Sequence, residues 1–440
     1  MIGNGQRHDG IRQHSVAAAA RGEQQSPGTA RAIEVSVDGR TLHLSPILAR
    51  DMCGCAKCVD QSTRQKFWSS AEIPRDIRAP ATTSTPDGIR IAWENDLPGY
   101  DDGHVTELST SFLRSIGLEY EHESIGPRTL CDRRDFERQP DVEYEQYMAD
   151  DATLLDVVER LHSHGLVFLS HVPESERSIS TITERIGIVK STFYGPIWDV
   201  RSVPQAKNVA YTTQDLGFHT DLMYLDQPPY IQLLHCIRSS SEGGASLFTD
   251  AYRSASDLFD EDPQAFKTLA CEDVTFHYNH PSSALYYKRR KSIQLRPLTL
   301  GGEKFSPDAV DQLQPRFQRH GPTIVDFIDA ISWSPPFQGP FALDRHVAAR
   351  SQDVAATLSD VVERWHAAAQ AFHRRIHRPE MVYERMMRPG ECVLFDNRRV
   401  LHARRAFAAG DAGKERWLRG AYLDRDVFES KLKVLRRQVR

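Results

Sequence analysis

Alternating apolar and polar residues mark the first ordered part of the chain. In "AIEVSVDGRTLHLSPILARD", Ile33, Val35 and Val37 alternate with polar residues before an Asp-Gly pair, which predicts a β-hairpin. "IRIAWEND" reads as a further strand, and "VTELSTSFLRSIG" has apolar residues at helical spacing. These segments predict a small β-rich domain.

Helical and strand patterns alternate in the larger part of the chain. "DDATLLDVVERLHSHG" places Leu154, Leu155, Val158 and Leu161 on one face and ends at Gly165, and "LVFLSHV" follows as a buried strand. Further helices are expected at "PQAFKTLA" and "DVAATLSDVVERWHAAAQAFHRRI", but short β-branched and aromatic runs dominate. We therefore predict a mainly β fold with helical buttresses, a distorted double-sheet barrel of the double-stranded β-helix (jelly-roll) kind.

The composition shifts suggest four regions. Residues 1–31 are rich in Gln, Gly, Ala and Arg and are expected to be disordered, with a mitochondrial presequence as the alternative. Residues 32–125 form the predicted N-terminal domain. The charged, proline-bounded segment 126–140 reads as a linker, and 141–440 as the large domain.

Charge and hydropathy exclude several classes of partner. The net charge is −5, no long basic block is present, and no apolar run reaches the roughly 18 residues that a membrane span requires. We expect no nucleic-acid or membrane partner. The predicted protein is cytoplasmic, with a mitochondrial location left open by residues 1–31, and it acts on a small molecule.

A cysteine cluster predicts a structural metal. The chain has seven cysteines, and "CGCAKC" places Cys53, Cys55 and Cys58 within six residues. Thiolates so close repel one another unless a soft cation neutralises them, and tetrahedral zinc needs four donors. His104, at the start of an expected helix, is the predicted fourth ligand, with His43 as the reserve. The alternative is a reduced, exposed thiol cluster.

A second donor set is spread along the large domain. In "FHTD", His219 and Asp221 lie two apart on an extended segment, so both face one ion while Thr220 faces away. His402 follows the strand Cys392–Phe395 in "ECVLFDNRRVLHARRAF" and supplies a third ligand. Nitrogen and oxygen donors without thiolate favour iron(II) over zinc. The alternative for His402 is an ordinary hydrogen-bonded histidine.

Two further residues would complete this site. Arg416, in "KERWLRGAYLD", lies fourteen residues after His402 on the expected next strand, where its planar guanidinium could bind a metal-chelating dicarboxylate. Ser246, in "GGASLFTD", could add a hydroxyl to the same carboxylate. Each of these residues alone would be weak evidence, and the prediction of one shared site is based on their order along the chain: His-x-Asp, Ser, His, Arg.

The chain resembles the γ-butyrobetaine dioxygenase and trimethyllysine dioxygenase group of the TauD-like iron(II)/2-oxoglutarate oxygenases. The matching segments are "RDMCGCAKC", "GHVTE", "STFYGPIWDV", "NVAYTT", "FHTD", "QLLHCI", "GGAS", "FDNRRVLHARRAF" and "RGAYLDRDV". The resemblance implies that the cysteine cluster and His104 hold zinc, that His219, Asp221 and His402 hold iron, and that Arg416 anchors 2-oxoglutarate.

The resemblance also implies a substrate site. Four residues match an aromatic cage for a trimethylammonium group: Tyr194, Trp198, Tyr211 and Tyr422. Asn208 matches a residue that meets the substrate carboxylate. Leu222 departs from the pattern, because γ-butyrobetaine dioxygenases tend to carry an aromatic residue there, and a companion asparagine has no counterpart near "SWSPPFQGPF". Core packing is the alternative role for the aromatic residues.

The expected reaction follows from the resemblance. It implies O2-dependent oxidative decarboxylation of 2-oxoglutarate to succinate and CO2, coupled to hydroxylation of an unactivated C–H bond, with ascorbate as reductant and a homodimer as the assembly. The preferred candidate substrate is γ-butyrobetaine, which would be hydroxylated to carnitine. Alternatives are trimethyllysine, hydroxylation or desaturation of another amino acid or specialised metabolite, and a catalytically dead zinc-binding interaction protein.

Overall fold

The computed structural model describes residues 32–100, 103–116, 126–201, 213–239, 243–300, 303–320, 323–408 and 416–439. The chain forms two units, Met1–Glu123 and Ser124–Arg440. The disorder expected for residues 1–31 lies outside the described residues. Within them, no helix has the length and apolar character needed to cross a membrane.

A hairpin opens the first unit, as the alternating pattern predicted. Strands β1 (Ile33–Val37) and β2 (Arg40–Leu44) pair antiparallel, and Asp38 and Gly39 join them. Both turn residues have positive φ, 49° and 76°, which a two-residue hairpin turn of the primed type requires. Helix α1 (Pro46–Asp51) follows, capped by the side chain of Ser45.

A three-stranded antiparallel sheet completes this unit. Its strands, in spatial order, are β3 (Arg78–Thr85), β4 (Gly88–Glu94) and β5 (Val105–Ser109), and the short helices are η1 (Ser70–Glu72) and α2 (Thr110–Ser115). The helix predicted over "VTELSTSFLRSIG" is therefore wrong for its first half. Thr106 and Leu108 are buried while Glu107 is exposed, a period of two, and Ser109 caps the helix that follows.

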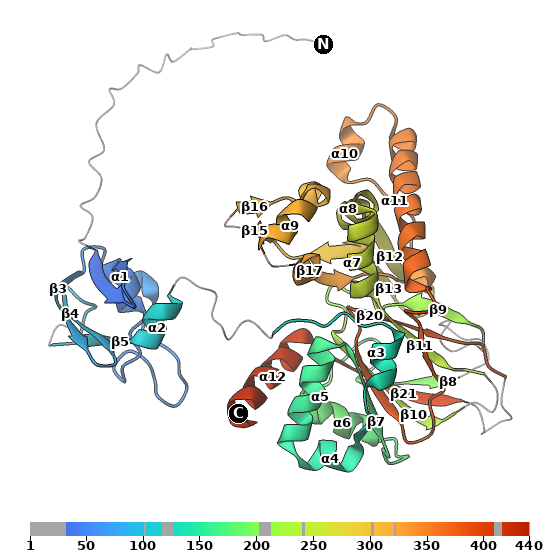
Figure 1. Cartoon of the computed structure of the whole chain (residues 1–440), viewed down its shortest axis with the longest axis horizontal. Helices are drawn as coiled ribbons and strands as arrows, with labels where there is room; N and C mark the ends of the chain where they lie inside the picture. Colours follow the sequence, from blue (N-terminus) through green and yellow to red (C-terminus); the bar gives the residue numbers. More distant parts are fainter. Residues whose placement is uncertain are drawn as a thin grey trace, which may run out of the picture. The chain divides into compact units, whose positions relative to one another are not determined.

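Two sheets form the centre of the second unit (Figure 1). The larger sheet has the order β6 (Val142–Glu143), β7 (Leu166–Ser170), β19 (Cys392–Asp396), β10 (Ile231–Arg238), β21 (Trp417–Leu423) and β8 (Ile197–Arg201). The smaller has the order β18 (Tyr383–Arg385), β11 (Ser246–Asp250), β20 (Val400–Arg404) and β9 (Leu216–His219).

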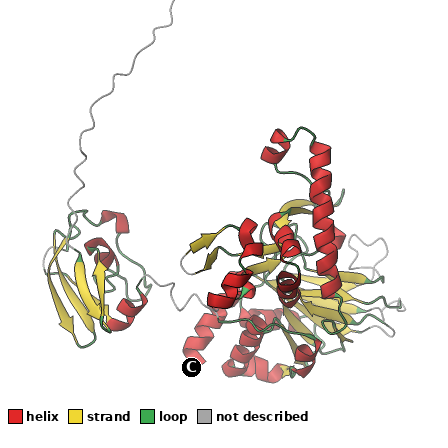
Figure 2. Ribbon diagram, turned by 45° about the horizontal axis from the view of Figure 1, so that its top comes forward, coloured by secondary structure: helices red, strands yellow, loops and turns green. Residues whose placement is uncertain are grey.

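Alternation along the strands gives the larger sheet two apolar faces. Leu166 and Phe168 share a core with Phe248 and Val400 of the smaller sheet, so this face packs sheet against sheet. Val167, like the other alternate residues, packs on helices instead. These helices are α4 (Tyr144–Ala149), α5 (Asp151–Ser163), α6 (Ser178–Ile186) and α12 (Arg425–Val439), which lie together on one side of the strands (Figure 2).

The segment 126–140, predicted as a linker, is part of the second unit. It contains helix α3 (Arg133–Arg138), whose Phe136 is buried in the core between the sheets. The backbone N–H of Cys131 donates to the Asp250 carboxylate at 2.9 Å. Charge and flanking prolines suggested a linker, but the buried ring of Phe136 and the hydrogen bond from Cys131 to Asp250 attach this segment to the core.

A long excursion, Ala251–Val382, separates β11 from β18. Its helices are α7 (Ala251–Glu261), α8 (Pro263–Cys271), α9 (Gln314–His320), α10 (Arg345–Arg350) and α11 (Val354–Ile376), with short turns η3 (Pro307–Gln312), η4 (Ile324–Phe327) and η5 (Pro335–Phe337). Its strands are β12 (Asp273–Asn279), β13 (Leu285–Lys291), β14 (Ile293–Leu295), β15 (Leu298–Leu300), β16 (Glu303–Phe305) and β17 (Ile328–Ile331). Helix α11, predicted from its periodicity, buries Trp365 and Phe372 in this region.

Candidate metal centres and active site

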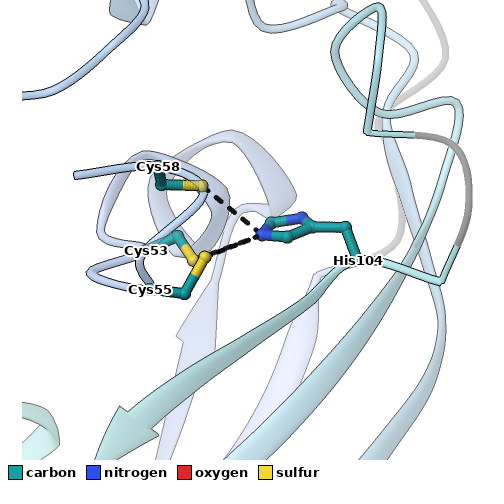
Figure 3. A group of neighbouring side chains, drawn as sticks. All are labelled: Cys53, Cys55, Cys58 and His104. Atoms are coloured by element: carbon teal, nitrogen blue, oxygen red, sulfur yellow. Dashed lines mark hydrogen bonds between the residues drawn. The ribbon is translucent and has the colours of Figure 1, made fainter. Parts of the chain in front are cut away.

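The cysteine cluster and His104 come together in the first unit (Figure 3). The Nε2 atom of His104 lies 3.5 Å from the Sγ atoms of Cys53 and Cys55, and 3.4 Å from that of Cys58. A tetrahedral Zn²⁺ with sulfur at about 2.3 Å and nitrogen at about 2.0 Å would place sulfur and nitrogen about 3.5 Å apart. The four donors therefore fit zinc in kind and in spacing.

Two residues that the sequence analysis missed support this cluster. Asp96 Oδ2 lies 2.7 Å from His104 Nδ1, and its Oδ1 accepts from Arg50 Nε at 2.5 Å. A carboxylate on Nδ1 leaves Nε2 as the electron-pair donor. Arg50, fully buried, also directs Nη1 to Cys58 Sγ at 3.3 Å. Burial, followed by the charge of Cys53, raises the pKa of the Cys58 thiol to about 12, so its thiolate needs a cation.

The reserve ligand lies elsewhere. His43 is exposed on the β1–β2 hairpin, where its Nδ1 lies 3.8 Å from Glu34. His104 itself precedes strand β5 and does not begin a helix, which corrects the local prediction while leaving the residue at the cluster.

The second donor set is assembled by strand pairing in the smaller sheet. His219, the last residue of β9, pairs directly with His402 of β20, and their ring centroids lie 4.1 Å apart. Asp221 lies two residues beyond β9, with Oδ1 3.4 Å from His219 Nε2 and Oδ2 4.0 Å from His402 Nε2. Three residues predicted from distant segments thus meet at one point.

The protonation of this set suits a divalent ion. His219 Nδ1 donates to the Gly217 carbonyl at 2.9 Å, which leaves Nε2 as a lone-pair donor. Burial, with the neighbouring His219, lowers the pKa of His402 to about 3, so its ring is neutral. Burial opposes ionisation of Asp221, but its contacts with His219, His402 and Tyr422 prevail and lower its pKa. Two imidazoles and a carboxylate, with no thiolate, fit iron(II).

Hydrogen bonds hold Asp221 from two sides. The hydroxyl of Tyr422 donates to its Oδ2 at 2.7 Å. Its backbone N–H donates to Asn397 Oδ1 at 2.7 Å, and its carbonyl accepts from Asn397 Nδ2 at 3.1 Å. Asn397, fully buried in the turn between β19 and β20, was missed from the sequence. A polar residue in a strand turn gives no signal that it is buried.

A small cavity of about 70 Å³ adjoins the three donors and contains the predicted cosubstrate residues. Arg416, immediately before β21, and Ser246, the first residue of β11, both line it. Arg416 is only 5% exposed, and within the described residues no carboxylate pairs with it. Burial lowers its pKa to about 10, so it is still cationic at neutral pH. A buried cation of this kind needs an anionic ligand.

The structure describes three of the four predicted cage residues, and one of them lines the cavity. Trp198 lines the cavity and stacks on Tyr422, with centroids 5.1 Å apart and planes inclined by 26°. Tyr194 lies against Phe193 at 4.0 Å. Asn208 and Tyr211 lie outside the described residues.

Further aromatic residues, which were not selected from the sequence, lie next to Tyr194. We call the whole group the aromatic wall; its members are Tyr194, Trp198, Tyr224, Tyr278, Phe337 and Tyr422. The hydroxyls of Tyr194 and Tyr224 lie 3.4 Å apart, and the ring of Tyr224 contacts Tyr278 at 5.5 Å and Phe337 at 5.1 Å. Tyr224 follows Leu222 by two residues. Leu222 is itself buried and has a positive φ of 61°, a left-handed conformation rare for a leucine.

Comparison with known proteins adds a family and several relatives. The model of the family described as "Taurine catabolism dioxygenase TauD, TfdA family" matches residues 124–422. The dioxygenase str8 of Strobilurus tenacellus is 32% identical over 406 residues, covering 88% of this chain and 84% of that protein. The γ-butyrobetaine dioxygenase of Pseudomonas sp. is 29% identical (91% and 92% covered), and the trimethyllysine dioxygenase of Meyerozyma guilliermondii is 28% identical (92% and 93% covered).

Proposed function

From the premise that this chain belongs to the TauD/TfdA family and is a 2-oxoglutarate-dependent dioxygenase, we propose that it hydroxylates an unactivated C–H bond of a small trimethylammonium carboxylate. γ-Butyrobetaine, giving carnitine, is the first candidate, and trimethyllysine the near alternative. The choice of these two substrates is based on the names of the relatives and on the aromatic residues beside the metal set.

One observation carries the proposal. Arg416 is a buried guanidinium without a carboxylate partner in the described chain, and it lines the same cavity as His219, Asp221 and His402. A cosubstrate that chelates a metal through one end and presents a carboxylate at the other satisfies both requirements at once. 2-Oxoglutarate has this chemistry.

The roles of the residues follow from their positions. His219, Asp221 and His402 would hold iron(II), and Arg416 with Ser246 would bind the distal carboxylate of 2-oxoglutarate. When bound, the iron and 2-oxoglutarate supply oxidative decarboxylation with O2, which yields succinate and CO2. The chain contributes positioning and the exclusion of water, and it needs no general base of its own.

The aromatic wall is assigned to substrate binding. Trp198 lines the cavity beside the metal set and stacks on Tyr422, and the hydroxyl of Tyr194 lies 3.4 Å from that of Tyr224. A trimethylammonium group cannot donate a hydrogen bond, and ring faces attract it by about 0.5–2 kcal/mol each. Tyr211 and Asn208 are proposed members of the same site.

A second candidate substrate class rests on Leu222. The resemblance leads one to expect an aromatic residue there, and the buried leucine removes one polar or π-rich contact next to Asp221. This favours another amino acid or a specialised metabolite, hydroxylated or desaturated by the same machinery.

The remaining assignments concern the architecture. We assign the two facing sheets to a double-stranded β-helix within an oxygenase domain, which takes in the packed segment 126–140 in addition to the predicted range 141–440. We assign residues 32–125 to a domain whose Cys53, Cys55, Cys58 and His104 bind structural zinc. Ascorbate as reductant and a homodimeric assembly in the cytoplasm complete the proposal.

Turnover of the purified chain tests the function. With iron(II), ascorbate and 2-oxoglutarate, the protein should release succinate, and a panel of trimethylammonium and amino-acid compounds should include one that gains one oxygen by mass. His219→Ala should abolish both signals. Succinate release that persists in His219→Ala would refute the metal assignment, and no turnover with any compound would favour a dead interaction protein.

Discrimination between substrates tests the aromatic wall. Trp198→Ala should weaken binding of a trimethylammonium substrate far more than binding of its neutral isostere, because only the cation gains from the ring face. Equal losses for the two compounds would assign Trp198 to core packing.

A further inference from the structure

The turn that carries Asp221 is held against its own backbone preference. Asp221 lies beyond the end of β9, and Leu222 after it adopts a φ of 61° with a buried side chain. Residues other than glycine and asparagine avoid this region, so the conformation persists only where surrounding contacts impose it. The contacts at Asp221 therefore have a positioning task.

Asn397 fixes the peptide of this residue. Its side chain accepts from the Asp221 N–H and donates to the Asp221 carbonyl, and the same Nδ2 also donates to the Pro229 carbonyl at 3.1 Å. The backbone N–H of Asn397 donates to Tyr230 O at 2.8 Å. With both ends of the loop tied to one buried amide, the remaining freedom of Asp221 is rotation of its carboxylate.

Tyr422 removes that freedom. Its hydroxyl donates to Oδ2 at 2.7 Å, while Oδ1 is the oxygen nearer to His219 Nε2, at 3.4 Å. A hydrogen bond on Oδ2 therefore fixes the rotation of the carboxylate with Oδ1 toward His219 Nε2. Tyr422 is a buried residue of β21, which pairs with β10 and β8. Trp198 of β8 stacks on its ring, so the ring is fixed in place.

We propose that Tyr422 is a positioning residue for the iron carboxylate: its hydroxyl orients Asp221, a role separate from that of its ring beside the substrate. The inference rests on the proposed function, since it presumes that Asp221 binds iron. The two parts of Tyr422 are separable, because Tyr422→Phe keeps the ring and removes only the hydroxyl.

The test is anaerobic titration of the full zinc-loaded chain with Fe(II), measuring the dissociation constant by equilibrium binding. Tyr422→Phe should weaken Fe(II) binding about 10-fold or more, the range typical of lost partners of metal ligands. The matched control is Tyr147→Phe. Tyr147 is also fully buried, and its hydroxyl donates to the Ile182 carbonyl at 2.9 Å, away from the three donors. The control should leave the Fe(II) constant unchanged while its thermal midpoint falls.

The Asp221→Ala variant distinguishes a failure of the positioning role of Tyr422 from a failure of the metal assignment. If Asp221→Ala loses Fe(II) while Tyr422→Phe binds it as tightly as the wild type, the positioning role is refuted and the metal site stands. Equal weakening in Tyr147→Phe and Tyr422→Phe would also refute it, because the loss would then reflect stability alone. If Asp221→Ala binds Fe(II) as well as the wild type, the metal assignment itself fails.

Discussion

At the scale of single residues, the proposed role of Arg416 can be tested most directly. Its burial without a carboxylate partner in the described residues is costly unless a ligand supplies the opposite charge. Its function in binding can therefore be measured separately from the metal, through the concentration of 2-oxoglutarate that the enzyme requires.

Arg416→Ala should raise the KM for 2-oxoglutarate about 30-fold or more, equivalent to about 2 kcal/mol, because truncating one partner of a buried charge pair costs at least that. Arg416→Lys should give an intermediate KM, since a lysine keeps the charge and loses the planar pair of donors. Succinate release at varied 2-oxoglutarate measures both. The control is Arg405→Ala, which should not change the KM. Arg405 is exposed, and its guanidinium pairs with Glu384 at 3.1 Å.

His235 provides a prediction about stability and pH. It is fully buried in β10, both ring nitrogens lack a partner in the described structure, and burial lowers its pKa to about 4. A depressed histidine pKa means that the unfolded chain binds the proton first, so stability is complete above about pH 6.5 and falls as the pH drops toward 4. The loss from this residue should reach about 3 kcal/mol.

Denaturant unfolding of the metal-free chain at pH 7.5 and pH 4.5 measures this loss. His235→Leu should flatten the pH dependence, whereas His346→Gln, at an exposed residue of α10, should leave it as in the wild type. A variant as acid-sensitive as the wild type would show that other groups dominate.

At the scale of elements, the pairing of β9 with β20 explains why distant histidines meet. The sequence allowed prediction of the β1–β2 hairpin, helix α5, strand β7 and the donors themselves, since each has a local signal in periodicity, a glycine stop or a His-x-Asp spacing. Strand register has no such signal. The meeting of His219 with His402 was predicted from their residue types and flanking strands and from the resemblance, but not from any signal of the strand pairing itself.

Local patterns also misled where tertiary contacts decided the structure. Val105–Ser109 reads as helix by spacing but forms β5, and the segment with Phe136 reads as linker but is packed. Asn397 and Tyr224 were missed because a buried polar turn and a loop aromatic look like their exposed counterparts. The excursion Ala251–Val382 has many short elements whose pairing a single sequence does not encode locally.

Strands β21 and β8 impose a steric condition on the aromatic wall. Gly420 pairs with Trp198, and a Cβ added at Gly420 would lie 2.3 Å from the indole ring. Gly420→Ala should therefore displace Trp198 and raise the KM for a trimethylammonium substrate by up to about 30-fold, with the KM for 2-oxoglutarate unchanged. Gly217→Ala is the matched control, because a Cβ there meets nothing within 4 Å and the carbonyl that accepts from His219 is retained. An unchanged substrate KM in Gly420→Ala would place Trp198 outside the substrate site.

At the scale of the whole molecule, the two units have separate cores. The apolar cluster of the first unit is small, with members such as Ile33, Ile91 and Leu108, and three thiols of the same unit converge on one imidazole. A core of this size gains much of its folding free energy from a bound metal.

Removal of zinc should therefore unfold only the first unit. A strong chelator, or Cys55→Ser, should make residues 32–116 sensitive to limited proteolysis while 126–439 stays resistant, as mass spectrometry of the fragments would show. Cys271→Ser, at a cysteine outside the cluster, should leave both units resistant. Protease resistance of 32–116 after complete zinc loss would contradict a structural role for the metal.

The excursion between β11 and β18 contributes to the aromatic wall but to neither the metal set nor the cosubstrate residues. All residues assigned to iron and cosubstrate come from segments outside Ala251–Val382, whereas Tyr278 and Phe337, which contact Tyr224 in the aromatic wall, come from inside it. Divergence within this one stretch can therefore reshape the surroundings of Tyr224, while the residues proposed for iron, cosubstrate and the trimethylammonium cage keep their places outside it. Swapping that stretch between relatives would show how much of the selectivity depends on these outer contacts.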